Sequence, residues 1–451
     1  MSSIGQKGMS RRAMLQWLAL ASGGAMMAAC VPAAQPGAGT EASADGAATA
    51  EKSELGVLVC CYTTPEVELR EAYNKKFIEV YPSTGVNMEL LAGQNYFEKL
   101  QTLIAAGTPP DLFDMWEGYI QPYAKNGALL NMDPLLEADE KIKKEDLVPA
   151  ALDAASWEGN LYSLTIGFMP GPISLYYNTQ HFADAGLDAP TPDWIWDDLR
   201  KAAQALTKDT NSDGTPETWG LSFDLWFVPW LYWIWSNGGD VFNAEQTAAT
   251  LDDPKSTAAI QYWADLVNVD KVAVPPATLS SMQGGTNAFM SGAVSMYLGN
   301  TWDVSTLKQA QDLPWKAVLS PKANDGNRIW YEHFWCWAIS SQTKVADVAW
   351  DFARDFVLDR VIDPATPTIP PLKQLLDKFN TETNEELGYT PLITLATEPD
   401  KFRIPGSGDK WDKISGMIQA ELDLVFIAEK TAAEAAATVV PTINEELART
   451  S

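Results

Sequence analysis

Residues 105–132 read AAGTPPDLFDMWEGYIQPYAKNGALLNM, and the fold of the chain can be worked out from this stretch. Gly107 favours the left-handed end of a preceding amphipathic helix, and the two prolines after it forbid the helix to continue. The short apolar run 111–115 lies between such breakers and predicts a buried strand. Trp116 and Glu117 follow at its carboxyl end, where open α/β sheets bind ligands. A flat ring beside a carboxylate predicts a pocket for a ligand with apolar faces and hydroxyl groups.

Strands and helices also alternate before this stretch. Residues 55–61 and 86–91 are apolar, strand-like runs, and each is followed by a helical pattern. Strand, helix, strand, helix, strand is typical of a parallel α/β lobe. Three polar residues fall where a strand ends or a helix begins and are predicted to contact the ligand: Tyr62, Thr63 and Gln94.

Composition limits the function classes. The 451 residues allow two sizeable domains, and 46% hydrophobic with 20% charged residues fits a soluble globular protein. A formal net charge of −27 repels nucleic acid and anionic lipid, so we expect neither as a partner. Beyond the N-terminal segment, no stretch is long and apolar enough to cross a bilayer.

The N-terminus predicts export. Two arginines precede an apolar run ending in small residues within 10–30, which indicates a signal peptide over residues 1–29. The arginine pair resembles a twin-arginine motif, but Met14 departs from it, so Sec export stays open. Ala-Ala-Cys before position 31 resembles a lipobox and predicts lipidation of Cys30. Residues 30–53 would then be a lipidated, flexible tether on the outer side of the cell membrane.

The remaining cysteines leave two alternatives open. Cys60 and Cys61 are adjacent in a predicted strand and point to opposite faces, so at most one can meet Cys336. A disulfide fits an exported protein, and buried free thiols fit equally. The spacing matches no metal site.

One loop resembles the beginning of a calcium loop. Acidic and amide residues alternate, with Gly at the sixth position, but the twelfth is Gly220 rather than Glu. A polar turn is therefore the preferred interpretation, and structural calcium is the only cofactor considered. The candidate ligands are Asp209, Asn211, Asp213, Thr215 and Glu217.

Several blocks resemble one family, in order along the chain. They are GTPPD at 107–111, GNLYSL at 159–164, LYYNTQHFADAGL at 175–187, TPDWIWDDLRKAAQALT at 191–207, AFMSGAVSMYLGNTWDVSTLKQA at 288–310 and WAIS at 337–340. Together they resemble the extracellular solute-binding proteins of ABC importers, family 1, the maltose-binding-like sugar receptors.

The resemblance implies an α/β, two-lobe periplasmic-binding-protein type II fold. Its sheets would be mixed but rich in parallel strands, with flanking helices and hinged inter-lobe crossings. We assign residues 54–166 plus 338–362 to lobe 1 and residues 167–337 plus 363–451 to lobe 2. The first crossing is expected at 166–172.

The resemblance also adds ligand-binding candidates. Trp226 and Trp230 flank a proline at a helix start, where the family approaches its sugar. Trp302 follows a strand and corresponds to a tryptophan that stacks on sugar. Trp335 shares a strand face with Trp337, and crowding favours a ligand role for the first of the pair. Four polar residues complete the prediction: Asp240, Asp303, His333 and Arg403.

A sugar receptor explains this chemistry best. Pyranose rings offer apolar faces to aromatic rings, and their hydroxyls bond well to charged groups. We therefore expect a monomeric receptor, not an enzyme, that captures an oligosaccharide or glycoside and delivers it to a transmembrane permease. A secreted glycoside hydrolase is the enzyme alternative, since acids are plentiful. The same fold binding a peptide or polyamine is the other alternative.

Overall fold

The computed structural model describes residues 53–60, 64–91, 96–169, 171–360, 368–379, 401–405 and 410–449. The predicted signal peptide, Cys30, the tether, Tyr62, Thr63 and Gln94 lie outside these residues, so their assignments stay predictions.

The strand predicted after the two prolines forms the centre of a five-stranded sheet ordered β2-β1-β3-β12-β6. The first three strands run parallel, and β12 is antiparallel to both of its neighbours. The sheet is therefore mixed, as predicted, but its two parallel pairings are matched by two antiparallel ones, so it is not rich in parallel pairings. Its strands are β1 (Ser53–Cys60), β2 (Thr84–Leu91), β3 (Leu112–Trp116), β6 (Ser163–Phe168) and β12 (Phe334–Ile339).

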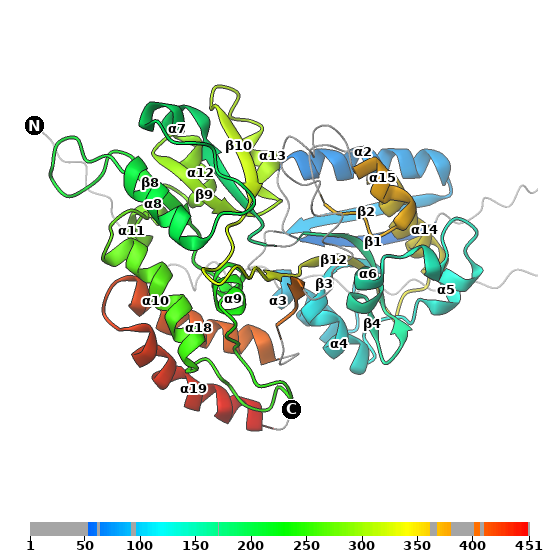
Figure 1. The fold of residues 1–451 in the computed structure, drawn as a ribbon. Helices are drawn as coiled ribbons and strands as arrows, with labels where there is room; N and C mark the ends of the chain where they lie inside the picture. Colours follow the sequence, from blue (N-terminus) through cyan, green and yellow to red (C-terminus); the bar gives the residue numbers. More distant parts are fainter. Residues whose placement is uncertain are drawn as a thin grey trace, which may run out of the picture. The chain divides into compact units, whose positions relative to one another are not determined.

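Alternate side chains along β1 point to opposite faces of this sheet, and each face is covered by different helices. Val57 and Val59 pack with α2 (Thr64–Val80) and α14 (Ala346–Arg360). Leu58 points the other way and belongs to the core under the helices that follow β2 and β3. These are α3 (Tyr96–Ala105) and α4 (Glu117–Lys125), seen in Figure 1 on the opposite side from α2.

Shorter elements complete this first lobe. They are α5 (Asp133–Ala138), η2 (Lys144–Asp146), α6 (Pro149–Ala154) and the predicted hairpin of β4 (Ser156–Trp157) and β5 (Asn160–Leu161). The hairpin turn places Glu158 and Gly159 at φ 49° and 80°, the left-handed conformation that tight two-residue turns require.

The second lobe is built on a four-stranded sheet ordered β10-β7-β9-β8. Its strands are β7 (Ser174–Asn178), β8 (Trp219–Phe223), β9 (Val294–Gly299) and β10 (Trp315–Leu319). Its helices are α7 (Thr179–Ala185), α8 (Trp196–Leu206), α9 (Phe227–Ser236), α10 (Pro254–Asn268), α11 (Pro276–Ser281), α12 (Gly285–Met290), α13 (Asp303–Leu307), α18 (Trp411–Phe426) and α19 (Ala432–Ala448). Ala428 at φ 60° and a capping box at Thr431 separate α18 from α19.

Two crossing segments connect the sheets and pair with each other. The first runs from β6 to β7 and the second from β11 (Trp330–Tyr331) to β12. The Gly171 and Tyr331 amides each donate to the other's carbonyl at 3.0 Å, and the Met169 amide donates to the His333 carbonyl at 2.8 Å. The segment between β6 and β7 overlaps the range 166–172 predicted for the first crossing.

The structure moves three of the predicted lobe boundaries. β6 of the first sheet continues to Phe168, so 167–168 belong to lobe 1 rather than lobe 2. All of β12 lies in the first sheet, so 334–337 belong to lobe 1 rather than lobe 2. Residues 368–379, including α15 (Lys373–Phe379), were also assigned to lobe 2. Instead, Ile369 pairs with Phe168 of β6, and Leu372 is buried in the first lobe's core. The sequence of 368–379 has no feature that shows which sheet it joins.

The cysteine alternatives are partly resolved. Cys336 is a buried free thiol, whereas Cys60 is disulfide-bonded, so these two are not paired with each other. Burial raises the pKa of the Cys336 thiol to about 12, and its sulfur lies 3.7 Å from the Thr165 hydroxyl.

Candidate functional site

Aromatic rings from both lobes meet at the second crossing. The imidazole of His333 lies with its centroid 5.5 Å from the Trp116 ring and 6.0 Å from the Trp302 ring, edge-on to both. Trp116 ends β3 of the first lobe, and Trp302 follows β9 of the second. Trp226, at the start of α9, lies 6.1 Å from Trp302. The structure therefore brings four predicted residues together.

These rings keep part of their surface open. Trp116, Trp226, Trp302 and His333 are all half-buried, unlike the many tryptophans in the two cores. Each ring follows a strand end, starts a helix or lies in a crossing, so the backbone presents it at the edge of a sheet. Half-buried indoles beside an imidazole offer apolar faces and one hydrogen-bonding edge to a ligand.

Glu117 lies at this site but serves the second crossing. Its carboxylate accepts hydrogen bonds from the Phe334 amide at 2.9 Å and from the Tyr331 hydroxyl. The His333 ring nitrogen lies 3.3 Å from the same carboxylate. Glu117 is buried, with its oxygens directed at these three residues. The predicted ligand role is replaced by one of fixing the crossing to the β3–α4 turn.

Glu332, which lies in the second crossing, carries a carboxyl group that is largely protonated at neutral pH. Burial, followed by the charges of Glu117 and Asp153, raises the pKa of Glu332 to about 8. The Glu332 amide donates to the Arg403 carbonyl at 2.9 Å, which ties the crossing to β13 (Phe402–Arg403).

Two predicted ligand tryptophans are core residues instead. Trp230 is 1% exposed, and its indole nitrogen donates to Gln419 at 3.2 Å. Trp335 is 4% exposed, and the guanidinium of Arg70 lies over its ring at 4.7 Å and over the ring of Trp337 at 5.0 Å. The crowding argument failed for Trp335 because a buried arginine occupies the space between the two rings.

Asp240 and Arg403 form an ion pair with each other. Asp240 also accepts from the Trp235 indole at 3.0 Å, and the Arg403 guanidinium lies 4.9 Å over the same ring. Both side chains are partly exposed, and their contacts are with α9 rather than with the aromatic rings around His333. The structure therefore does not place them in the candidate site.

Asp303 holds the turn that carries Trp302. Its carboxylate accepts from the Asn300 amide at 2.7 Å and from the Tyr297 hydroxyl at 3.1 Å. Burial raises the pKa of Asp303 to about 7, despite the amide donor. Asp303 thus positions the ring beside it and is 8% exposed, so the structure gives it a structural role in this turn.

The same turn has polar atoms that sequence reasoning missed. The side-chain oxygens of Asn300 and Thr301 are buried and have no hydrogen-bond partner within the described part of the chain. Gly171 of the first crossing packs against this turn, because a Cβ there would lie 2.4 Å from the Asn300 side-chain oxygen and 3.3 Å from the Trp302 ring. The crossing and the aromatic site are therefore in direct contact.

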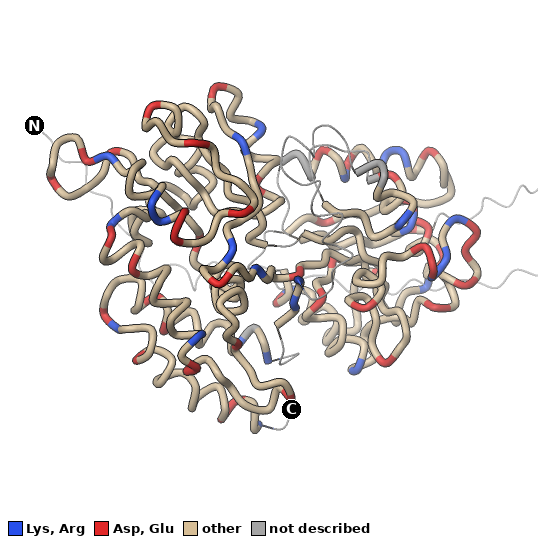
Figure 2. The backbone as a smooth tube through the Cα atoms, viewed as in Figure 1, with Lys and Arg blue, Asp and Glu red and all other residues tan. Residues whose placement is uncertain are grey.

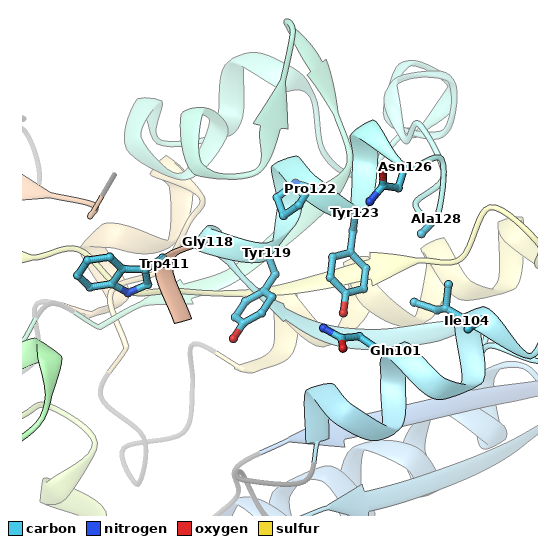
Figure 3. Close-up of a pocket in the computed structure, with 10 residues that line it drawn as sticks. Gln101, Ile104, Gly118, Tyr119, Pro122, Tyr123, Asn126, Ala128 and Trp411 are labelled. Atoms are coloured by element: carbon cyan, nitrogen blue, oxygen red, sulfur yellow. The ribbon is translucent and has the colours of Figure 1, made fainter. Parts of the chain in front are cut away.

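Sequence reasoning also missed a groove beside Trp116. A cavity of about 340 Å³ runs between α3 and α4, with Trp411 of α18 at one end (Figure 3). Tyr119 and Tyr123 project into it one helical turn apart, and Trp411 contacts Phe227 at 5.9 Å. In the sequence, these groove residues could have been recognised as a tyrosine pair spaced four residues apart and a tryptophan at a helix start.

The calcium-like loop closes on itself through backbone hydrogen bonds. Asp209 accepts from the Gly214 amide at 2.9 Å, Asp213 from Thr215 at 2.8 Å, and Glu217 from Thr210 at 2.7 Å. Within the described ranges, no group of three or more His, Cys, Asp or Glu side chains is arranged to hold a metal ion. Calcium binding by this loop stays a prediction for a titration to test.

Charge distribution and helix lengths add two observations. Figure 2 shows acidic and basic residues interspersed over the described backbone, with acids in the majority, as the net charge of −27 requires. None of the helices in the described part of the chain has the length and hydrophobicity needed to cross a membrane.

Comparison with known proteins decides the family. A family model described as bacterial extracellular solute-binding protein matches residues 64–358, more than half of the chain. The chain belongs to this family. Its fold is the two-lobe fold of such solute-binding proteins, so the predictions of fold class and family are confirmed.

Individual relatives of this solute-binding protein are distant. A putative binding protein of Brucella abortus is 24% identical over 291 residues, covering 63% of this chain and 67% of that one. The maltotriose-binding protein of Pyrococcus abyssi is 22% identical over 300 residues, covering 65% and 57%.

Solved structures with the same fold cover the chain more completely. An ABC substrate-binding protein of Listeria monocytogenes, solved with cycloalternan, has a TM-score of 0.78 at 23% identity and covers 88% of this chain and 100% of its own. The maltose-bound MalE3 of T. maritima has a TM-score of 0.72 at 17% identity, covering 88% and 99%.

Proposed function

We propose that this solute-binding protein is the carbohydrate receptor of an ABC importer. The observation that carries the proposal is the meeting of Trp116 and Trp302 at His333. The rings come from different lobes, so a sugar between them contacts both lobes at once. Similar proteins solved with maltose, cycloalternan and acarbose support a sugar over a peptide or polyamine.

Lobe closure follows from the position of these rings beside the crossings. A ligand shifts an open–closed equilibrium only through contacts that are better in the closed state. A sugar stacked on one tryptophan gains its second aromatic face, and loses more water, when the other lobe closes over it. The paired crossings at Gly171 and Tyr331 are short extended segments, which suits hinge bending.

Export and anchoring complete the proposal. Lipidation at Cys30 would hold the receptor on the outer side of the membrane, and the tether would let the lobes turn toward a permease. A monomer suffices for capture, because the two walls of the proposed site come from one chain. No cofactor is required for binding, so calcium would be structural only.

Hydrolysis is not the proposed function, because the acids at the site have other roles. Glycosidases need one carboxyl group to protonate the leaving oxygen and a second to attack or activate water. Glu117 is bonded to the crossing, and Asp303 holds the Asn300 amide. Neither carboxylate is directed at the faces of Trp116 and Trp302.

A thermal-shift screen tests the proposal. The protein from Glu51 onward, which forms one compact unit, is heated with mono-, di- and oligosaccharides and with peptides and polyamines as controls. A ligand at a hundred times its Kd adds about 2.7 kcal/mol of stability. A rise with a sugar that is recovered intact is the expected result. A rise with cleavage indicates a hydrolase, and a rise with peptides or polyamines alone overturns the ligand class.

A further inference from the structure

We infer that the groove between α3 and α4 is an additional binding subsite that takes the outer end of an oligosaccharide whose other end lies at Trp116 and Trp302. This rests on the proposed function and extends it, because it specifies a chain of several sugar units rather than a single small sugar. The groove is lined by α3, α4 and the residues that follow α4, together with Trp411 of α18.

The groove is continuous with the aromatic site. Along α4, the ring of Trp116 lies 6.0 Å from that of Tyr119, and Tyr119 lies 6.3 Å from Tyr123. The three rings recur at spacings of three and four residues, which places them on one face of the helix. Phe97 of α3 contacts Trp116 at 4.9 Å and stacks on Tyr119 at 3.8 Å, so a row of aromatic rings links the site to the groove.

A second run of rings joins the groove from the other lobe. Trp302 contacts Trp226 at 6.1 Å, Trp226 contacts Phe227 at 4.9 Å, and Phe227 contacts Trp411 at 5.9 Å. This run also begins beside His333 and ends at Trp411, which lines one end of the groove. The path from site to groove is thus bordered by aromatic side chains from both lobes.

The groove also offers hydrogen bonds suited to hydroxyl groups. Trp411 is 7% exposed, and its indole nitrogen has no hydrogen-bond partner among the residues that the structure describes. Figure 3 shows that nitrogen on the ring edge nearer Tyr119. The amides of Gln101 and Asn126 line the same groove and make no side-chain hydrogen bond within the described residues. An amide both donates and accepts, as a sugar hydroxyl does.

Size and composition agree with a sugar chain as the occupant. At about 340 Å³, the cavity is at the small end of the range of about 300–1,000 Å³ typical of small-molecule pockets. Its walls are mostly aromatic and aliphatic and carry amides instead of charged groups, which suits uncharged hydroxylated rings. A peptide end would bring a charged amine or carboxylate, and none of the described residues that line the groove is ionised to pair with it.

Chain-length dependence of affinity tests the subsite. The Kd of the protein from Glu51 onward is measured by calorimetry for α-1,4-glucans and β-1,4-mannans from the disaccharide to the hexasaccharide. Tyr123→Ala and the exposed Gln101→Ala are compared with the wild type, with circular dichroism confirming their folding. Trp302→Ala is the matched variant of the central site.

We expect both groove variants to weaken the longer oligosaccharides by about two- to tenfold and to leave the disaccharide unchanged. Trp302→Ala should weaken every length. Equal losses at all lengths, or no loss at any length, in Tyr123→Ala and Gln101→Ala would overturn the subsite while leaving the receptor intact. Wild-type protein that binds no carbohydrate in any assay would overturn the proposed function and the subsite together.

Discussion

The amide of Phe334 donates a 2.9 Å hydrogen bond to the carboxylate of Glu117. This bond joins the turn after β3 to the first residue of β12. Because β12 is reached through the second crossing, Glu117 fixes where that crossing leaves the first lobe. The hinge and the aromatic site around His333 therefore share one carboxylate.

Glu117→Gln should destabilise the fold by about 1–3 kcal/mol, because a buried charged acceptor of three donors is replaced by a neutral amide. Chemical denaturation of wild type and variant gives the difference. Exposed Glu79→Gln is the control and should change little. If Glu117→Gln unfolds at the wild-type denaturant concentration, the carboxylate does not hold the crossing.

Arg70→Met should cost about 3–5 kcal/mol, because it leaves the fully buried Asp114 carboxylate without its cation. The variant also removes the guanidinium from the rings of Trp335 and Trp337. The matched control is Lys76→Met, which breaks the exposed pair with Asp359 and should cost about 1 kcal/mol at most. If both variants lose a similar amount of stability, the buried Arg70–Asp114 pair contributes no more than an exposed ion pair.

Sequence alone could predict those features whose contacts are made by residues adjacent in the chain. The β3–α4 stretch contains its own breakers, apolar run and aromatic end, so the strand and the place of Trp116 could be predicted from adjacent residues. The partners of Glu117 lie more than two hundred residues away, at Tyr331 and Phe334. A carboxylate at a strand end has the same sequence pattern whether it bonds a ligand or another loop.

The tryptophans show the same limit. Both Trp226 and Trp230 were predicted to contact the ligand from a helix start. Trp226 is half-buried, but one turn later Trp230 is covered by α18. For Trp335, strand alternation gave the right face and the wrong role, since Arg70 comes from a distant helix. Periodicity predicts which face a residue is on, and the packing of remote helices decides whether that face is open.

Stability should fall as the pH rises from about 4.5 to about 8, in part because of Glu332. Its pKa is raised from 4.5 to about 8, so across this window the unfolded chain loses the proton that the folded protein keeps. The unfolded state then binds fewer protons, and the free energy of unfolding decreases with pH.

Glu332→Gln should therefore flatten this decline and raise the melting temperature at pH 8 relative to the wild type. Melting curves at pH 5, 6, 7 and 8 are the measurement, with exposed Glu71→Gln as the control that keeps the wild-type slope. A variant slope as steep as the wild-type slope would show that the carboxyl of Glu332 ionises normally in the folded protein.

Gly171→Ala should lower ligand affinity more than stability. Its new methyl group would lie 2.4 Å from the Asn300 side-chain oxygen, 2.9 Å from Val228 and 3.3 Å from the Trp302 ring, so these side chains must move to make room. In enzymes, a misplacement of about 1 Å can cost about a hundredfold in rate, so a displaced Trp302 ring should also weaken ligand binding. Gly416→Ala, at an exposed helix position with no atom within 4 Å, is the control. If Gly171→Ala binds the ligand with wild-type affinity, the packing of the first crossing against Trp302 does not affect binding.

The most direct test of the receptor is the Kd for the sugar found by the thermal-shift screen, measured in wild type, Trp302→Ala and Trp157→Ala. Trp157 is a half-buried tryptophan of the β4–β5 hairpin and serves as the control. If Trp302 binds the sugar, its loss should cost at least about 2 kcal/mol, roughly a thirtyfold weaker Kd, with Trp157→Ala unchanged. Wild-type affinity in Trp302→Ala would contradict the site between the two lobes.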